Sequence, residues 1–356
     1  MHKYGKDLTD VSWFHQDLQS KDSELLAIQN RTEAKYLEAP KRESCIICSS
    51  PLGGTQRFNR NGIEFIFCEV CGHVNGNHEI TPDFIAATYT SCDSLASESG
   101  VYDDEFTQGK MAGDYWDVVN RIYSAKADFL RKFVISQNLD PAAISILDAG
   151  CGSGHFINAL LKSGLENSRG FDSFAPAVEA ARRIGKLSNA QAALTEPNEL
   201  LDIISDADAT IVSMMCVLVH LESPIEALVA MKKNKNTRFT FQKIPMWSFA
   251  TILESALPEY RARVLGSDHT NVFTEESLAW IEKSVGLRRV ASWTFGGDYL
   301  DLQRKTIAGM KKNGSSQDLI NRAADELSKI SNDVQLAIDT NKLSSELHVI
   351  WEFERI

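Results

Sequence analysis

The sequence has no long apolar run and is poor in positive charge. No stretch approaches the roughly 18 uninterrupted apolar residues of a membrane-spanning helix, and the first 19 residues lack the apolar core of a signal peptide. Both absences predict a cytoplasmic protein with no membrane partner. Internal repeats and low-complexity segments are also absent, and ordinary aromatic and charged fractions exclude wholesale disorder and collagen-like or coiled-coil classes.

The shortage of positive charge bears on the class of partner. Lysine and arginine number 37 against 48 aspartate and glutamate residues, giving a formal net charge of -11. Phosphate backbones are bound by cationic side chains that release counterions, so this balance argues against a nucleic-acid partner. A small-molecule substrate is the expected partner, and nothing in the sequence indicates the oligomeric state.

The chain is long enough to bury one large core and a smaller satellite module. It has 356 residues, of which 43% are hydrophobic. We expect a helical lead-in at 1–40, a four-cysteine zinc-binding module at 41–80 and a main domain at 83–356, with a helical insertion near 300–345. Capping-type residues at 22–24 and Pro40 indicate a helix within the lead-in.

Apolar runs alternate with helical segments through the main domain, which predicts a parallel sheet covered on both faces. Near the end of the chain, two segments alternate apolar and polar residues, as half-exposed antiparallel strands do. The fold class is therefore α/β, a Rossmann-like doubly wound sheet with antiparallel terminal strands, plus a small N-terminal zinc ribbon and helical additions. The expected strands lie at 144–148, 168–172, 209–213, 238–244, 287–295 and 347–355.

A glycine-rich segment, DAGCGSG at 148–154, directly follows one predicted strand and precedes a helix. Glycines there permit a tight turn, and the helix N-terminus offers unpaired N–H groups to a ligand. Asp172 ends the next strand, where a carboxylate can accept both hydroxyls of a ribose. A nicotinamide fingerprint would need glycine where His155 stands. An ordinary structural loop is the remaining alternative.

The D-x-G-x-G-x-G segment resembles the first motif of class I S-adenosylmethionine-dependent methyltransferases. The segments 209–224 and 269–278 resemble that family's fourth strand with its following histidine and a later histidine–phenylalanine segment, although Val219 replaces the usual glutamate. The resemblance implies S-adenosylmethionine as cofactor, with the adenine near 195–199. The cofactor-binding residues that it implies are Asp148, Gly150, Cys151, Gly152, Gly154, Asp172, Ser173 and Glu196.

Two C-x2-C pairs, Cys45 with Cys48 and Cys68 with Cys71, are separated by 19 residues. Four thiolates at this spacing can converge tetrahedrally on a structural zinc ion, whose contribution is folding energy. Four unrelated buried or redox-active thiols are the alternative. The segment 41–80 holds four basic and four acidic residues, so we expect a scaffold or a wall beside the substrate. For Cys92 and Cys216 the sequence favours core packing.

A hydroxyl acceptor of a methyl group needs a base, and histidine suits this role near neutral pH. His220 and His269 both fall in the region that faces the substrate in the resembled family, so we take them as candidate catalytic residues; a structural role is the alternative for each. Weaker candidates are Gln242 and Lys243 for polar substrate contacts, and Tyr89, Tyr102 and Trp116 for a lid.

These features favour an enzyme that methylates a small polar metabolite. Proteins with a four-cysteine module before such a domain often act on carbohydrates, so a sugar or a nucleotide-linked sugar is the expected acceptor, methylated on oxygen or carbon. An RNA-base methyltransferase is one alternative, disfavoured by the acidic composition. A non-catalytic S-adenosylmethionine-binding protein is another, disfavoured by the intact cofactor motifs.

Overall fold

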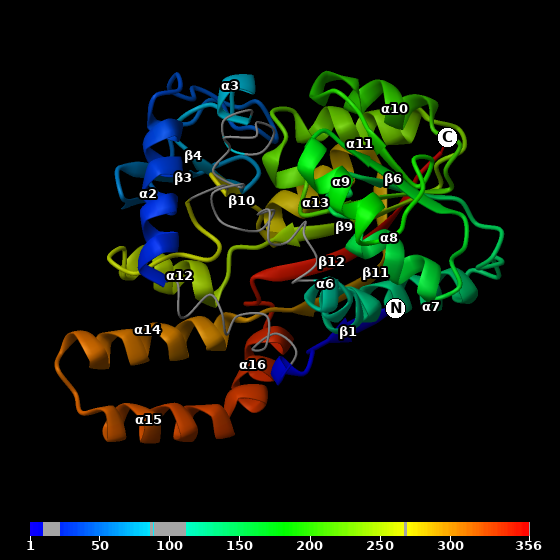
Figure 1. Cartoon of the computed structure of the whole chain (residues 1–356). Helices are drawn as coiled ribbons and strands as arrows, with labels where there is room; N and C mark the ends of the chain where they lie inside the picture. Colours follow the sequence, from blue (N-terminus) through cyan, green and yellow to red (C-terminus); the bar gives the residue numbers. More distant parts are fainter. Residues whose placement is uncertain (10–21, 86–87, 89–111, 267–268, 356) are drawn as a thin grey trace.

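The computed structural model describes residues 1–9, 22–85, 88, 112–266 and 269–355. In this part of the chain, an eight-stranded sheet forms the centre, with helices on both sides (Figure 1). In order across the sheet, its strands are β7 (Ala192–Leu194), β6 (Ser168–Asp172), β5 (Ile146–Ala149), β8 (Ile211–Met215), β9 (Phe239–Pro245), β12 (Glu346–Phe353), β11 (Leu287–Phe295) and β1 (His2–Tyr4).

The strand directions confirm the predicted fold class. Strands β7, β6, β5, β8 and β9 are all parallel, while β12 runs antiparallel to both β9 and β11. The first strand, β1, pairs in parallel with β11 through His2 and Ser292. This edge strand lies inside the region expected to be a helical lead-in. The sequence did not predict it, because pairing with a strand almost 300 residues later leaves no local signal.

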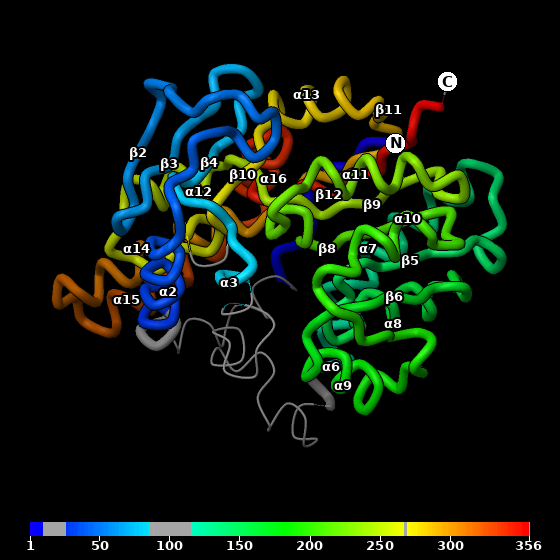
Figure 2. Tube along the Cα trace, turned by 90° about the horizontal axis from the view of Figure 1, so that it is seen from above, coloured from blue at the N-terminus to red at the C-terminus, as the bar shows by residue number. Residues whose placement is uncertain are grey.

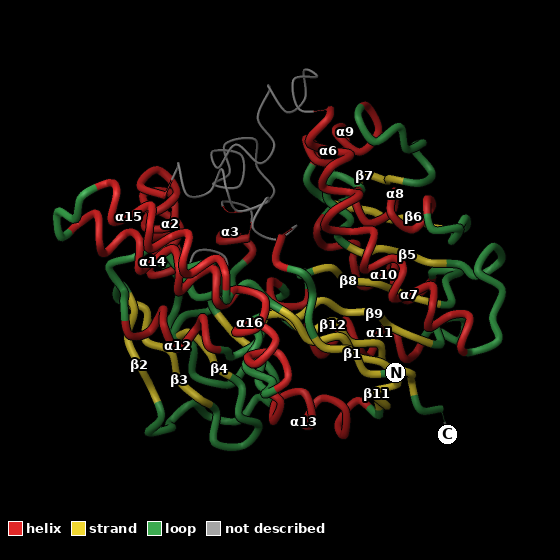
Figure 3. The backbone as a smooth tube through the Cα atoms, turned by 90° about the horizontal axis from the view of Figure 1, so that it is seen from below, coloured by secondary structure: helices red, strands yellow, loops and turns green. Residues whose placement is uncertain are grey.

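Alternation along the central strands fills an apolar core on each face of the sheet. Ile146 and Ile211 enter one core, whereas the next residues, Leu147 and Val212, enter the other, as the pleat of a strand requires. Strands buried on both faces read as continuous apolar runs, which is why the sequence located them. Helices α7 (Ser124–Ser136), α8 (His155–Lys162) and α9 (Ala175–Arg183) cover the first face, and α10 (Leu200–Asp206), α11 (Pro224–Lys233) and α13 (Glu275–Val285) cover the second (Figure 3).

The four cysteines belong to a small module that lies beside the main sheet (Figure 2). Its sheet contains β2 (Arg57–Arg60), β3 (Ile63–Phe67) and β4 (Val74–Gly76), flanked by helices α2 (Asp22–Leu37) and α3 (Pro82–Ile85). A fourth strand, β10 (Asn271–Val272), pairs antiparallel with β4 and comes from the C-terminal half of the chain. The module is therefore completed by residues outside 41–80, and the division of the chain into domains stays a prediction.

Three of the remaining helices of the described residues lie in the predicted helical insertion. Helices α14 (Asp298–Lys312) and α15 (Gln317–Lys329) run side by side as an arm away from the sheet (Figures 1 and 3), and α16 (Ser331–Thr340) leads back to β12. Outside it lie α12 (Phe249–Ala256), α6 (Ala112–Val118), the π-helical turn η2 (Val119–Tyr123) and the 3-10 turns η3 (Pro197–Glu199) and η4 (Leu218–His220). None of the helices in the described ranges combines the length and apolar character that crossing a membrane requires.

Candidate active site

The glycine loop joins β5 to α8 at the carboxyl edge of the sheet. Gly150, Gly152 and Gly154 have φ values of 75°, 51° and 72°, in the left-handed region that favours glycine. A Cβ atom on Gly150 would lie 2.5 Å from Cγ2 of Val217, which follows β8. Glycine is thus required both by backbone conformation and by the close approach of the neighbouring loop.

Asp172 lies at the end of β6 and is hydrogen-bonded to the glycine loop. Its carboxylate accepts hydrogen bonds from the backbone N–H groups of Gly152 and Phe174, both at 2.8 Å. Each carboxylate oxygen has a second lone pair, so these bonds leave acceptor capacity for a ligand's hydroxyls. Burial raises the pKa of Asp172, and its hydrogen bonds to backbone N–H groups oppose that rise. Ser173, half-buried, follows it directly.

Asp148 lies beneath the loop and is only 1% exposed. Its Oδ1 atom accepts a hydrogen bond of 2.6 Å from the Ser213 hydroxyl on β8. Burial raises the pKa of Asp148 to about 7, so its proton equilibrium falls close to neutral pH. Cys151 is buried in a small apolar cluster that includes Ile157 and Leu187, which agrees with a packing role for its side chain.

The segment expected near the adenine follows β7. The Thr195 N–H donates to the Asp172 carbonyl at 3.1 Å, which places this segment beside the end of β6. Glu196 is exposed and precedes the 3-10 turn η3 as its N-cap, where its backbone N–H donates to the Glu199 carboxylate at 2.8 Å. The predicted cofactor residues thus follow one another along a single edge of the sheet.

Aromatic rings flank the start of α8. The Tyr115 hydroxyl donates to the Ser153 carbonyl at 2.8 Å, and its ring stacks on His155 with centroids 4.3 Å apart. Burial lowers the pKa of His155 to about 4, so this imidazole is neutral at physiological pH. Trp116, a lid candidate, packs edge-on against Tyr115. The other candidates, Tyr89 and Tyr102, and also Cys92, lie outside the described residues.

The two histidines named from the sequence meet in space. His220 ends the turn η4 after β8, and His269 precedes β10. Their rings stack with centroids 5.0 Å apart and an interplanar angle of 13°. Nothing in the sequence pairs these residues, because they are separated by 49 positions and by two further helices.

Cys216 completes this cluster, which we call the Cys216 group: Cys216, His220 and His269. The Cys216 Sγ atom lies 3.4 Å from Nε2 of His269. Cys216 is half-buried and contacts His269. Core packing, which the sequence favoured, therefore describes only part of its surroundings. Its non-glycine backbone has a φ of 66°, an unfavourable conformation that orients the residue at the strand end. The Cys-x3-His spacing of Cys216 and His220 was the available signal.

Charged side chains surround this end of β8 and β9. Nζ of Lys243 lies 3.4 Å from the Glu346 carboxylate on β12. Burial disfavours the Cys216 thiolate, but the Lys243 and His269 charges hold the pKa of Cys216 well below its usual range. Burial also lowers the pKa of Lys126 to about 7. Gln242, named with Lys243, is fully buried, and its amide N–H donates to the Thr240 hydroxyl.

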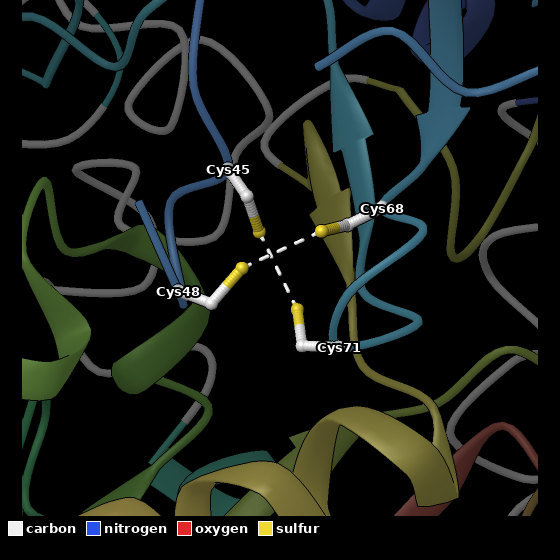
Figure 4. A group of neighbouring side chains, drawn as sticks. All are labelled: Cys45, Cys48, Cys68 and Cys71. Atoms are coloured by element: carbon white, nitrogen blue, oxygen red, sulfur yellow. Dashed lines mark hydrogen bonds between the residues drawn. The ribbon is translucent and has the colours of Figure 1, made fainter. Parts of the chain in front are cut away.

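The four predicted metal-binding cysteines point toward a common centre (Figure 4). Sγ of Cys45 lies 3.5 Å from Sγ of Cys71, and Sγ of Cys48 lies 3.4 Å from Sγ of Cys68. All four sulfur atoms lie within 4.8 Å of one another. Four sulfur atoms around a shared centre fit a tetrahedral thiolate site, with no position left for a substrate.

A polar chain connects the cysteine module to the Cys216 group. The ring Nε2 of His73, in the module, lies 3.1 Å from Oδ1 of Asn271 on β10. The Asn271 side-chain N–H in turn donates to the Val219 carbonyl at 2.7 Å, next to His220. The Thr274 hydroxyl also donates to the Gly72 carbonyl at 3.1 Å. The module therefore supports the two segments that carry the histidines.

Residues 119–292 match the family model of a methyltransferase domain. No curated protein matches the chain. Solved structures that resemble it include magnesium protoporphyrin IX methyltransferase from Synechocystis with bound S-adenosylhomocysteine, at 14% identity and a TM-score of 0.40 over 56% of this chain and 94% of that one.

Two further solved structures show a similar level of likeness. The plantazolicin methyltransferase BamL has 16% identity and a TM-score of 0.42, over 73% of this chain and 91% of its own. A methyltransferase from Archaeoglobus fulgidus has 18% identity and a TM-score of 0.36, over 64% and 94% respectively. Likenesses this remote are no guide to the acceptor molecule.

Proposed function

We propose that the chain, whose residues 119–292 match a methyltransferase domain, uses S-adenosylmethionine to methylate a small polar metabolite, namely a sugar or a nucleotide-linked sugar. Support comes from the polar character of the site: Lys243, Glu346 and the histidine pair lie together at the carboxyl edge of the sheet. Ligands of open α/β sheets bind beyond this edge. An acceptor with several hydroxyl groups suits such surroundings.

For the cofactor, we propose that the glycine loop packs against the methionine portion and that Asp172 binds the ribose hydroxyls. The bonds from Gly152 and Phe174 hold the Asp172 carboxylate in one orientation, which prepares it for this role. The full set of proposed cofactor residues is Asp148, Gly150, Cys151, Gly152, Gly154, Asp172, Ser173 and Glu196.

The observation that carries the proposal is the contact between the cofactor loop and the loop that bears His220. Gly150 and Val217 approach so closely that no Cβ fits between them, and His220 follows three residues later. We propose that the histidine pair activates the acceptor, most simply by one imidazole taking its proton. The acceptor atom then attacks the methyl carbon in line, and the electron pair of the breaking C–S bond passes to the sulfonium sulfur.

We further propose that Cys45, Cys48, Cys68 and Cys71 hold a structural zinc ion and that their module forms a wall of the acceptor site. The sulfur arrangement fits the ion, and the contacts of Asn271 with His73 and Val219 support the wall. No disulfide bond joins the cysteines of the described residues, which suits the reducing cytoplasm as the enzyme's compartment.

Calorimetry with S-adenosylmethionine and S-adenosylhomocysteine, followed by a methyl-transfer screen against nucleotide sugars, tests this proposal. We expect both cofactor forms to bind, and His220→Gln or His269→Gln to lower kcat by about 10²- to 10⁴-fold while cofactor affinity is retained. His2→Gln, at the far edge of the sheet, serves as the matched control and should retain full turnover. Methylation of RNA bases with no transfer to any sugar would contradict the proposed acceptor, and no binding of either cofactor form would contradict the proposed site.

A further inference from the structure

The Cys216 group brings together three side chains that are all good ligands for a transition metal. Cys216, His220 and His269 each offer one donor atom, and the three donors lie within 4.8 Å of one another. Among the residues that the structure describes, this is the second such group, besides the four cysteines of the module. It lies at the carboxyl edge of the sheet, not inside the module.

The measured separation within the group fits a bound ion. With Zn–S near 2.3 Å and Zn–N near 2.05 Å, a tetrahedral angle places sulfur and nitrogen about 3.6 Å apart. Sγ of Cys216 and Nε2 of His269 are separated by 3.4 Å. A metal ion can therefore bind both atoms with little movement of either residue.

The hydrogen bonding of His269 also suits a ligand. Its Nδ1 atom lies 3.1 Å from the Val264 carbonyl oxygen. Since a carbonyl cannot donate, Nδ1 carries a hydrogen, and Nε2, the atom that faces Cys216, is the ring nitrogen left to bind a metal ion. A backbone carbonyl that accepts from the second ring nitrogen is a regular feature around metal-bound histidines, because it fixes both tautomer and ring orientation.

The backbone of Cys216 gives a further, independent indication. Its φ of 66° is costly for a residue with a Cβ atom, and such a cost is typical of positions with a functional role. The turn places Cys216 and His220 on the same loop, with the His220 ring stacked on His269. Three donors are thus gathered from two chain segments at one point.

We propose that Cys216, His220 and His269 bind a second metal ion, of the zinc class, whose free coordination position takes a hydroxyl or thiol of the acceptor. A thiolate with two imidazoles favours zinc or cobalt over magnesium and calcium. Three protein ligands with one free position are typical of catalytic zinc, whereas four thiolates are typical of structural zinc. The inference rests on the proposed function for its acceptor, and it makes the two histidines metal ligands instead of general bases.

A bound ion of this class would supply Lewis acidity, which lowers the pKa of a coordinated hydroxyl or thiol. The acceptor's proton then passes to solvent and its lone pair forms the new bond to the methyl carbon. The bond between that carbon and the sulfonium sulfur breaks, with its electrons going to sulfur. No oxidant or second co-reactant is needed.

Metal content of the purified full chain tests the inference. We expect two equivalents of zinc in the wild type and one in Cys216→Ser or His220→Gln, with circular dichroism unchanged. Cys151→Ser removes a thiol at the same edge and should keep both equivalents. The inference would be overturned if the wild type held only one equivalent of zinc and Cys216→Ser and His220→Gln held the same amount.

Cobalt(II) replacement gives a second readout that does not depend on activity. Of the five thiolates in the two groups, Cys216→Ser removes one, so about one fifth of the thiolate-to-cobalt absorbance should be lost. An unchanged cobalt spectrum would count against the site. Calorimetry with S-adenosylmethionine separates the two proposals: a chain that binds the cofactor but holds no second metal contradicts only this inference, whereas two metals without methyl transfer contradict only the proposed function.

Discussion

The four-cysteine cluster and the Cys216 group both contain thiols that can bind metal, but different parts of the chain hold them in place. Cys45, Cys48, Cys68 and Cys71 come from turns of a small module with a short sheet. Cys216 stands at the end of β8, in the middle of an eight-stranded sheet with a core on each face. Cys216, fixed at the end of a packed strand, needs no ion to stay in position, whereas donors on the turns of a small module do.

The largest expected effect is a loss of stability when the four-cysteine cluster is disrupted. Cys48→Ser, or removal of metal with a strong chelator, should destabilise the module by several kcal/mol, on the order of 5 or more, because a segment this small buries too little apolar surface by itself. Thermal unfolding together with zinc analysis measures the effect. Cys216→Ser is the matched comparison, and we expect it to change stability by only about 1 kcal/mol.

The outcome is informative in both directions. If the wild type holds no metal and Cys48→Ser unfolds at the wild-type temperature, the four thiols are ordinary packing residues. If Cys216→Ser is as destabilising as Cys48→Ser, the distinction between a cluster that folds the chain and a group that the sheet supports is wrong.

A smaller loss of stability, together with a loss of cofactor affinity, is expected from a substitution in the cofactor loop. Gly150→Ala introduces a Cβ 2.5 Å from Val217 at a φ of 75°, so we expect a loss of about 2 to 4 kcal/mol in stability and at least tenfold in S-adenosylmethionine affinity. Gly164→Ala is the control, since its φ is 84° but nothing lies within 4 Å of the new atom. It should cost about 1 to 2 kcal/mol and leave affinity unchanged. Equal losses of affinity in both variants would show that the contact with Val217 is unimportant.

The smallest expected effect concerns pH and the charges beside Cys216. Burial lowers the pKa of Lys126 from 10.5 to about 7, with Lys243 assisting and Glu346 opposing the change. Between pH 7 and 10 the unfolded chain therefore binds more protons than the folded one, so this group makes stability rise with pH across that window. Lys126→Met should remove about 1 to 2 kcal/mol of that rise. Denaturant unfolding of the wild type and Lys126→Met at pH 7 and 9 measures the free energy of unfolding. An equal change with pH in both proteins would contradict the lowered pKa of Lys126.

The sequence predicted those parts of the fold that depend on neighbouring residues. The glycine segment, the two cysteine pairs and the apolar central strands are local patterns, and the structure has strands and turns where they stand. The helical insertion expected near 300–345 contains three helices, two of which meet at Ile330. Strands β1 and β10 gave no signal, because each is short and is stabilised only by a partner far away in the chain.

The candidate site shows the same limit. His220 and His269 were each found by resemblance to a motif, but their stacking and the approach of Cys216 depend on how β8 and β10 are placed. Cys216 itself was interpreted as a packing residue, since its spacing to His220 alone does not indicate a shared site. Only the three-dimensional arrangement shows that one thiol and two imidazoles share a location.

Strand β10 also has a consequence for how the protein is made. Its Asn271 pairs with Asn75 of β4, 196 positions earlier. When all four cysteines have left the ribosome, the nascent chain therefore still lacks the last strand of their sheet. At usual rates of translation, roughly 10 to 40 seconds separate the synthesis of these two strands. During that interval one edge of the sheet is open, and early capture of zinc by the cysteines would hold the unfinished module together until its final strand arrives.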